Sequence, residues 1–138
     1  MISIKFVNMK HTLGKEERLK SKKLIERLYT ERNSVKAFPL RMIFLQTEHT
    51  SNFPAQVGVS VPKRNFKSAV DRNRLKRLMR ESYRLQKEIV YNHLEKPYIF
   101  MISYIGKEAC TYDEMFLKME KLLTRFIEET KNINNDKI

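Results

Sequence analysis

Catalysis by protein side chains needs reactive groups that converge, and the acidic residues of this chain are not spaced to do so. A metal-dependent nuclease, for instance, holds its ions between carboxylates from several directions. The acidic residues that lie closest in this sequence are direct neighbours instead: Glu16-Glu17, Asp113-Glu114 and Glu128-Glu129. Neighbouring side chains on a helix point about 100° apart and do not easily share one ion. Helix capping explains Asp113 and Glu114 better than catalysis does.

The histidines and the cysteine offer no better site. His11, His49 and His93 are scattered along the chain, and a surface polar role is the simplest interpretation of each. Cys110 is the only cysteine, which excludes an intrachain disulfide and a thiolate zinc cluster and fits a reducing compartment. We therefore expect no catalytic residue and no metal ligand in the protein itself.

Positive charge is the chemistry that the sequence does offer. The 138 residues include 28 Lys or Arg against 16 Asp or Glu, a formal net charge of +12, which indicates an anionic partner such as nucleic acid or a membrane surface. Residues 63–87 hold ten of these bases and two acids, whereas residues 88–138 hold seven bases and nine acids. No apolar run is long enough for a membrane span or a signal peptide, so we expect a cytoplasmic protein.

On a helix over residues 68–93, most of these charges fall on one face. A turn of about 100° per residue places Leu75, Leu78 and Met79 on the opposite side. The polar face consists of Asn73, Lys76, Arg77, Arg80 and Arg84. An ordinary solvated face mixes acids with bases, because like charges four residues apart destabilise a helix. The excess of arginine favours phosphate, which its planar group binds through two hydrogen bonds.

The elements that position this helix alternate in type along the chain. Ser21 predicts the cap of a first helix, and alternating apolar residues predict strands over 38–46 and 55–62, which should pair, with room for a short strand between them. After the basic helix, residues 97–106 predict a strand buried on both sides, and a capping box at Thr111 opens a last helix. The prediction is one α+β domain over residues 1–138, a two-layer α/β sandwich, with 1–12 and 130–138 flexible.

Two segments resemble the signature of a known family, the protein subunit of bacterial ribonuclease P. The strand VGVSVPKR (57–64) is followed by the helix VDRNRLKRLMRE (70–81), and the family pattern is Arg-Asn-x-x-Lys-Arg-x-x-Arg-Glu. Its positions are filled here by Arg72, Asn73, Lys76, Arg77, Arg80 and Glu81. The resemblance extends to ERLKSKKLIERLY and covers roughly residues 13–126. It implies an α-β-β-β-α-β-α order and a mixed central sheet with a left-handed crossover around the basic helix, against the usual right-handed preference.

The resemblance also implies that an RNA is the catalyst and that this protein is the non-catalytic subunit of an endoribonuclease. The partners would be the ribonuclease P RNA and the 5′ leader of precursor tRNA, without a membrane and with one protein monomer per RNA subunit. The holoenzyme would need Mg²⁺ through its RNA, and no cofactor is assigned to side chains of the protein. The predicted contacts with the RNA subunit are Lys63, Arg64, Lys67, Arg72, Asn73, Lys76, Arg77, Arg80 and Arg84.

The leader is assigned, by the same resemblance, to a cleft between the first helix and the sheet. The matching positions are Ile25, Tyr29 and Phe44. Aromatic rings there suit stacking on single-stranded bases, although ordinary core packing explains Tyr29 and Phe44 about as well. The charge pattern alone leaves two further functions open: a structural protein of the ribosome or another RNA assembly, and a sequence-specific DNA-binding protein.

Overall fold

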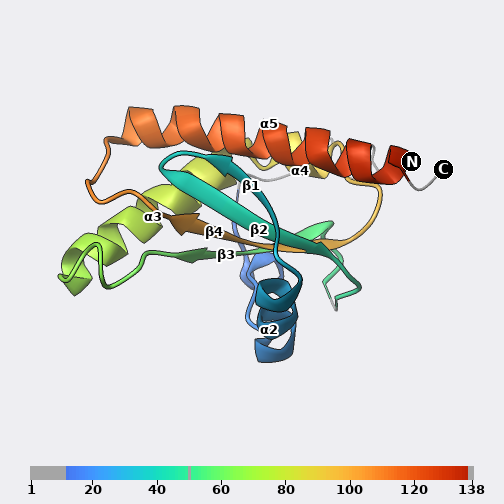
Figure 1. Ribbon diagram of the computed structural model, residues 1–138, viewed down its shortest axis with the longest axis horizontal. Coiled ribbons are helices and arrows are strands. Elements are labelled where there is room, and N and C mark those ends of the chain that lie inside the picture. Colours follow the sequence, from blue (N-terminus) through green and yellow to red (C-terminus); the bar gives the residue numbers. More distant parts are fainter. Residues whose placement is uncertain (1–11, 50, 137–138) are drawn as a thin grey trace.

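The computed structural model describes residues 12–49 and 51–136, and within them helices cover both faces of a single sheet (Figure 1). A short 3₁₀ turn, η1 (Lys15–Glu17), precedes the first helix. The helices are α2 (Lys22–Glu31), α3 (Ala69–Gln86), α4 (Glu88–Tyr91) and α5 (Tyr112–Asp136). The strands are β1 (Asn33–Ala37), β2 (Leu40–Gln46), β3 (Ala55–Ser60) and β4 (Tyr98–Tyr104). The order confirms the predicted α+β class.

The sheet is mixed, with the strands in the order β1-β2-β4-β3. β4 pairs antiparallel with β2 and parallel with β3, so the prediction that β2 and β3 pair with each other is wrong. β4 is one of the two interior strands, and six of its seven residues are buried, which confirms the prediction of a strand buried on both sides. β3, α3 and β4 form a parallel β-α-β connection, and its left-handed sense stays a prediction.

The third predicted strand lies in a different place from the one that the sequence suggested. β1 comes before Pro39 and pairs with β2 as a hairpin, whereas the connection after β2 contains no strand among its described residues. β1 escapes prediction because its segment, Asn-Ser-Val-Lys-Ala, has one fully buried residue, Ala37. An edge strand of this kind shows no apolar alternation.

The two faces of the sheet carry separate apolar cores. α3, α4 and α5 cover one face, and α2 lies alone on the other (Figure 1). The larger core includes Phe44, Tyr83, Phe100 and Phe126 between the sheet and the three helices. The smaller core lies beneath α2 and consists of Leu19, Leu28, Ile43, Leu45, Ile99 and Met101. The direction in which a β2 side chain points therefore decides which helix it meets.

The basic helix begins where its cap predicts and ends earlier than expected. The Ser68 hydroxyl accepts a hydrogen bond from the Asp71 N–H at 3.4 Å. The predicted single helix to about residue 93 is interrupted at Lys87, between α3 and α4. The buried stripe of α3 also includes Tyr83, which the sequence analysis missed, whereas Leu85 is 37% exposed. Both ends of α3 are thus fixed, one by its cap and one by burial of Lys87.

The last helix confirms its predicted cap and continues further than predicted. The Glu114 N–H donates to the Thr111 hydroxyl at 3.2 Å, and the Thr111 N–H donates to the Glu114 carboxylate at 3.0 Å. Thr130 is buried and α5 runs to Asp136, and the flexibility expected for residues 130–138 stays a prediction. The other predicted flexible segment, 1–12, lies outside the described residues except for Thr12.

Candidate nucleic-acid interface

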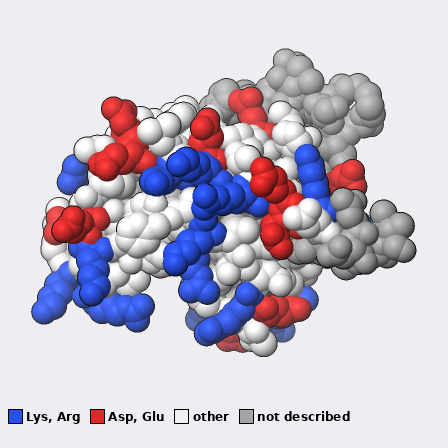
Figure 2. All heavy atoms as spheres, turned by 45° about the horizontal axis from the view of Figure 1, so that its top comes forward, with Lys and Arg blue, Asp and Glu red and all other residues white. Residues whose placement is uncertain are grey.

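The outer face of α3 presents the basic residues that the sequence analysis predicted. Asn73, Arg77 and Arg80 are exposed and Lys76 is half-buried, while Leu75 and Met79 on the inner face are buried. None of the ion pairs between described residues involves Lys76, Arg77 or Arg80. Figure 2 shows acidic side chains mixed with basic ones over much of one side of the molecule, with Lys and Arg gathered at its lower left corner. The outward charges of α3 are therefore available to an anion.

Arg84 differs from the other bases of this face. It forms an ion pair with Glu81, and its Nε lies 3.2 Å from Glu81 Oε2. The hydrogen bond from Arg84 lowers the pKa of the Glu81 carboxyl, so the pair is ionised at neutral pH. The mixing of acids with bases that is typical of a solvated face therefore does occur at this end of α3, where Glu81 compensates Arg84. The predicted contact between Arg84 and RNA stays a prediction. To make it, Arg84 would have to share its guanidinium between Glu81 and a phosphate.

Arg72 ties the loop before α3 to the start of the helix. Its Nη1 donates to the Phe66 carbonyl at 2.8 Å and to the Lys67 carbonyl at 2.9 Å. The loop carries Lys63, Arg64 and Lys67, all exposed, which the sequence analysis added to the basic surface. Arg72 therefore holds these three cations next to the α3 face, whether or not it contacts RNA itself.

A hollow of about 250 Å³ lies between α2 and the sheet, where the leader cleft is expected. Tyr29 lines it and is 42% exposed, which is the position that stacking on a base requires. The hollow is lined by Tyr29, Arg32, Arg41, Ile43, Ser60, Pro62, Arg64, Ser103 and Ile105. On its floor the hydroxyl oxygens of Ser60 and Ser103 are 2.7 Å apart. Aromatic, cationic and hydroxyl groups thus meet in one groove, and Arg64 joins it to the basic loop.

The placement of Phe44 in this cleft is wrong. Phe44 is 2% exposed and packs on the opposite face of the sheet, where its ring centroid lies 5.0 Å from that of Phe126. Adjacent residues of a strand point to opposite faces, so its neighbour Ile43 lines the hollow instead. Ile25 lies on α2 as predicted, half-buried against the smaller core. Of the three predicted residues, only Tyr29 lines the hollow.

The side chains considered for catalysis have other surroundings. The described residues contain no group of three or more His, Cys, Asp or Glu that could hold a metal ion. Burial raises the pKa of the half-buried Cys110 thiol, which disfavours the nucleophilic thiolate. The His93 Nδ1 lies 2.8 Å from the Ile89 carbonyl, and His11 lies outside the described residues. The expectation of a non-catalytic protein stays a prediction.

Glu17 and Lys87 form a buried ion pair that the sequence did not reveal. Their exposed fractions are 2% and 1%, and the Lys87 Nζ lies 2.6 Å from Glu17 Oε2. The same oxygen accepts a hydrogen bond from the Tyr91 hydroxyl at 2.5 Å, and the Lys87 Nζ also donates to the Thr12 carbonyl. The only sequence signal was a lysine among the apolar residues near the end of the predicted helix. The pair fastens the segment before α2 to the end of α3.

The fold and its surface define a class of small α+β proteins that present a cationic helix and a separate groove. Comparisons with known proteins identify the family within this class. The family model for ribonuclease P matches residues 13–127. The ribonuclease P protein component of Porphyromonas gingivalis (strain ATCC 33277) is 38% identical over 117 residues, which are 82% of this chain and 85% of that protein. The chain belongs to the ribonuclease P protein family.

Solved structures of this family share the fold. The ribonuclease P protein of Thermotoga maritima superposes with a TM-score of 0.64 at 22% identity, covering 79% of this chain and 96% of that one. A Staphylococcus aureus ribonuclease P protein gives a TM-score of 0.59 at 25% identity, over 84% and 93% of the two chains. Among the described residues, no helix is both long enough and apolar enough to cross a membrane.

Proposed function

We propose that this protein is the RNA-binding, non-catalytic subunit of ribonuclease P, which assists a catalytic RNA in removing the 5′ leader from precursor tRNA. The observation that carries the proposal is the outer face of α3, which presents Asn73, Lys76, Arg77 and Arg80 while the inner face of the helix is buried. These three cations have no acidic partner in an ion pair between described residues. Family membership names the RNA for which such a face is suited.

The basic surface of α3 and the hollow at Tyr29 bind different parts of the complex between the RNA subunit and precursor tRNA. The α3 face and the loop at Lys63, Arg64 and Lys67 bind phosphates of the RNA subunit, since arginine and lysine neutralise backbone charge. The hollow at Tyr29 takes the leader, because a ring that is exposed on one side stacks on any base. Arg64 lies at both surfaces and so links the RNA subunit to the substrate.

The chemical step belongs to the RNA in this proposal. Mg²⁺ is supplied through the RNA subunit, and the protein acts as a monomer, one copy per RNA, in the cytoplasm. Neutralisation of phosphates by the protein reduces the repulsion between RNA subunit and substrate, which lowers the Mg²⁺ concentration that the complex needs.

Reconstitution tests this function directly. The protein is mixed with its matching RNA subunit at low Mg²⁺, and cleavage of precursor tRNA is measured. We expect no cleavage by the protein alone and a clear rise in cleavage when it joins the RNA. Tighter binding of precursor than of mature tRNA by the complex separates this function from a general RNA-assembly role. Equal stimulation by an unrelated basic protein would contradict the proposal.

A further inference from the structure

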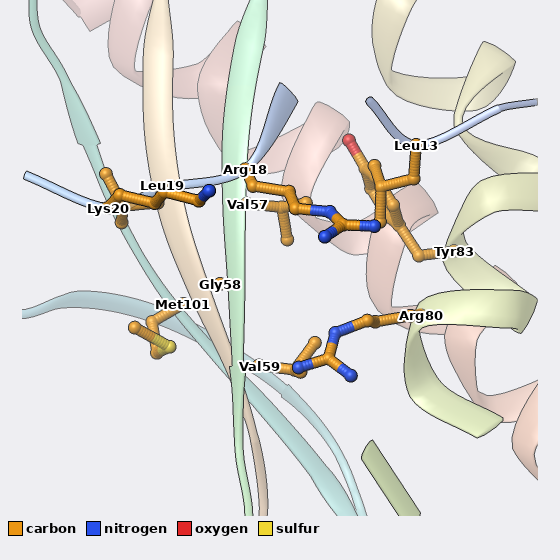
Figure 3. Close-up of a pocket in the computed structure, with 10 residues that line it drawn as sticks. All are labelled: Leu13, Arg18, Leu19, Lys20, Val57, Gly58, Val59, Arg80, Tyr83 and Met101. Atoms are coloured by element: carbon orange, nitrogen blue, oxygen red, sulfur yellow. The ribbon is translucent and has the colours of Figure 1, made fainter. Parts of the chain in front are cut away.

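A second hollow, of about 270 Å³, lies at the outer edge of β3 and is separate from the leader groove. Two of its lining residues are arginines from different parts of the chain, Arg18 before α2 and Arg80 on α3. Both guanidinium groups point into the space between β3 and α3 (Figure 3). Pockets that enclose drug-sized ligands measure roughly 300–1,000 Å³, so this hollow suits a smaller group.

Arg18 is held in place by its neighbours in the sequence. Arg18 forms a parallel bridge with Val57, and the Leu19 N–H donates to the Val57 carbonyl at 2.9 Å. Glu17, the preceding residue, is fixed by its buried ion pair with Lys87. The backbone of Arg18 therefore has little freedom, although its side chain is exposed.

Arg80 and the wall beside it are equally fixed. Arg80 follows the buried Met79 on α3, and Tyr83, one turn on, is fully buried at the inner side of the hollow. Burial raises the pKa of the Tyr83 hydroxyl, so the wall carries no charge at neutral pH. Residues two apart in a strand direct their backbone groups to the same edge. The Val59 N–H therefore points to the outer edge of β3, where the Val57 carbonyl accepts its hydrogen bond from the Leu19 N–H.

The charge of the hollow is entirely positive. Its lining includes Arg18, Lys20 and Arg80 and no acidic residue, and no ion pair between described residues involves them. Two planar donor groups that face one space can each give paired hydrogen bonds to a tetrahedral oxyanion. The backbones that carry these two groups are already held in place, so a shared ligand has to order only the two side chains.

We propose that Arg18 and Arg80 together form a subsite for one phosphate group, and that a backbone phosphate of the RNA subunit occupies it. The proposal rests on the proposed function and extends it, because it adds Arg18, which lies outside the basic helix, to the RNA-binding residues. It also makes the segment 16–19 part of the RNA surface. The Glu17–Lys87 ion pair that anchors this segment then positions Arg18.

A double-mutant cycle tests whether the two arginines share one phosphate. RNA-subunit affinity is measured for the wild type, Arg18→Ala, Arg80→Ala and the double variant. Lys23→Ala serves as the matched control, because this exposed lysine near the start of α2 lies outside the hollow. We expect each arginine substitution to weaken binding about tenfold, the usual scale for a charged hydrogen bond, and the control to have a clearly smaller effect. The double variant should lose less than the product of the single effects.

Inorganic phosphate distinguishes the source of the ligand. In the free protein, phosphate should shift the NMR signals of the Arg18 and Arg80 Nε–H groups together, and each single variant should abolish the shift at the remaining arginine. Addition of the RNA subunit should displace the phosphate. Phosphate that stays bound in the RNA complex would overturn the proposal and indicate a site for free phosphate.

The outcomes separate this inference from the proposed function. Multiplicative losses in the double variant, or an Arg18→Ala effect no larger than that of Lys23→Ala, would overturn the shared subsite while stimulation of cleavage continues to support the subunit role. Absence of any binding between the wild-type protein and its matching RNA would overturn both. Arg18→Lys keeps the charge and loses the paired donors, so it should restore only part of the affinity.

Discussion

Substitution of Lys87 by methionine should destabilise the protein strongly although it adds no polar group. Lys87 is 1% exposed and neutralises the Glu17 carboxylate at 2.6 Å. Methionine preserves most of the side-chain volume but leaves the buried Glu17 carboxyl without its cationic partner, with the Tyr91 hydroxyl still donating to it. Removing one partner of a buried ion pair costs about 3–5 kcal/mol. That loss is a large fraction of the roughly 5–15 kcal/mol that stabilises a typical domain.

Urea unfolding followed by circular dichroism measures this loss. Lys121→Met is the control, because Lys121 is exposed on α5 and is expected to change the free energy of unfolding by less than about 0.5 kcal/mol. The double variant Glu17→Gln with Lys87→Met removes both charges and should recover much of the stability. A loss below about 1 kcal/mol for Lys87→Met, at an unchanged urea slope, would refute the reasoning that this pair is buried.

Three further predictions concern the RNA surfaces and the last helix. Arg77→Ala should weaken binding of the RNA subunit and lower the salt dependence of that binding by about one counterion; an unchanged slope in a salt titration would remove Arg77 from the phosphate contacts. Tyr29→Ala should weaken binding of precursor tRNA by about 1–3 kcal/mol without a similar effect on mature tRNA. Phe44→Ala should instead lower the free energy of unfolding by about 3–5 kcal/mol, because it leaves a cavity in the core. If Phe44→Ala weakened precursor binding and Tyr29→Ala mainly reduced stability, Phe44 would belong to the cleft after all. The hydrogen bonds from the Thr111 backbone N–H and hydroxyl lower the pKa of Glu114 below its ordinary 4.5, so this cap stabilises fully above that pH and is lost as the pH falls through the lowered value. Glu114→Gln cannot titrate and should reduce the acid sensitivity measured by thermal unfolding between pH 5 and 2, and an unaltered pH profile would contradict that role.

Patterns within a few residues predicted the helices well, but they could not predict which distant strands pair. Ser68 and Thr111 cap α3 and α5 as predicted, because a cap is a contact between residues three apart. The place of β4 between β2 and β3 depends on which distant segments pair with it, which no short window of sequence expresses. A hydrophobic run predicts that a strand is central without identifying its neighbours.

The error at Phe44 has a specific cause in β2. Both faces of this strand are apolar, with Met42 and Phe44 on one side and Ile43 and Leu45 on the other. Alternation therefore could not show which set meets α2, and a shift of one residue exchanges the faces completely. The basic face of α3 was predictable, in contrast, because its apolar and charged sides differ along the whole helix.

The separation of the apolar side chains into two cores has a consequence for motion. α2 has one fully buried residue, Leu28, and rests on the smaller core, whereas α5 is anchored by residues such as Met119, Leu122 and Phe126 in the larger one. Local opening requires less free energy where fewer apolar contacts must break. Amide hydrogens of α2 should therefore exchange with solvent sooner than those of α5. Under the proposed function, such opening would let the wall that bears Tyr29 adapt to leaders of different sequence.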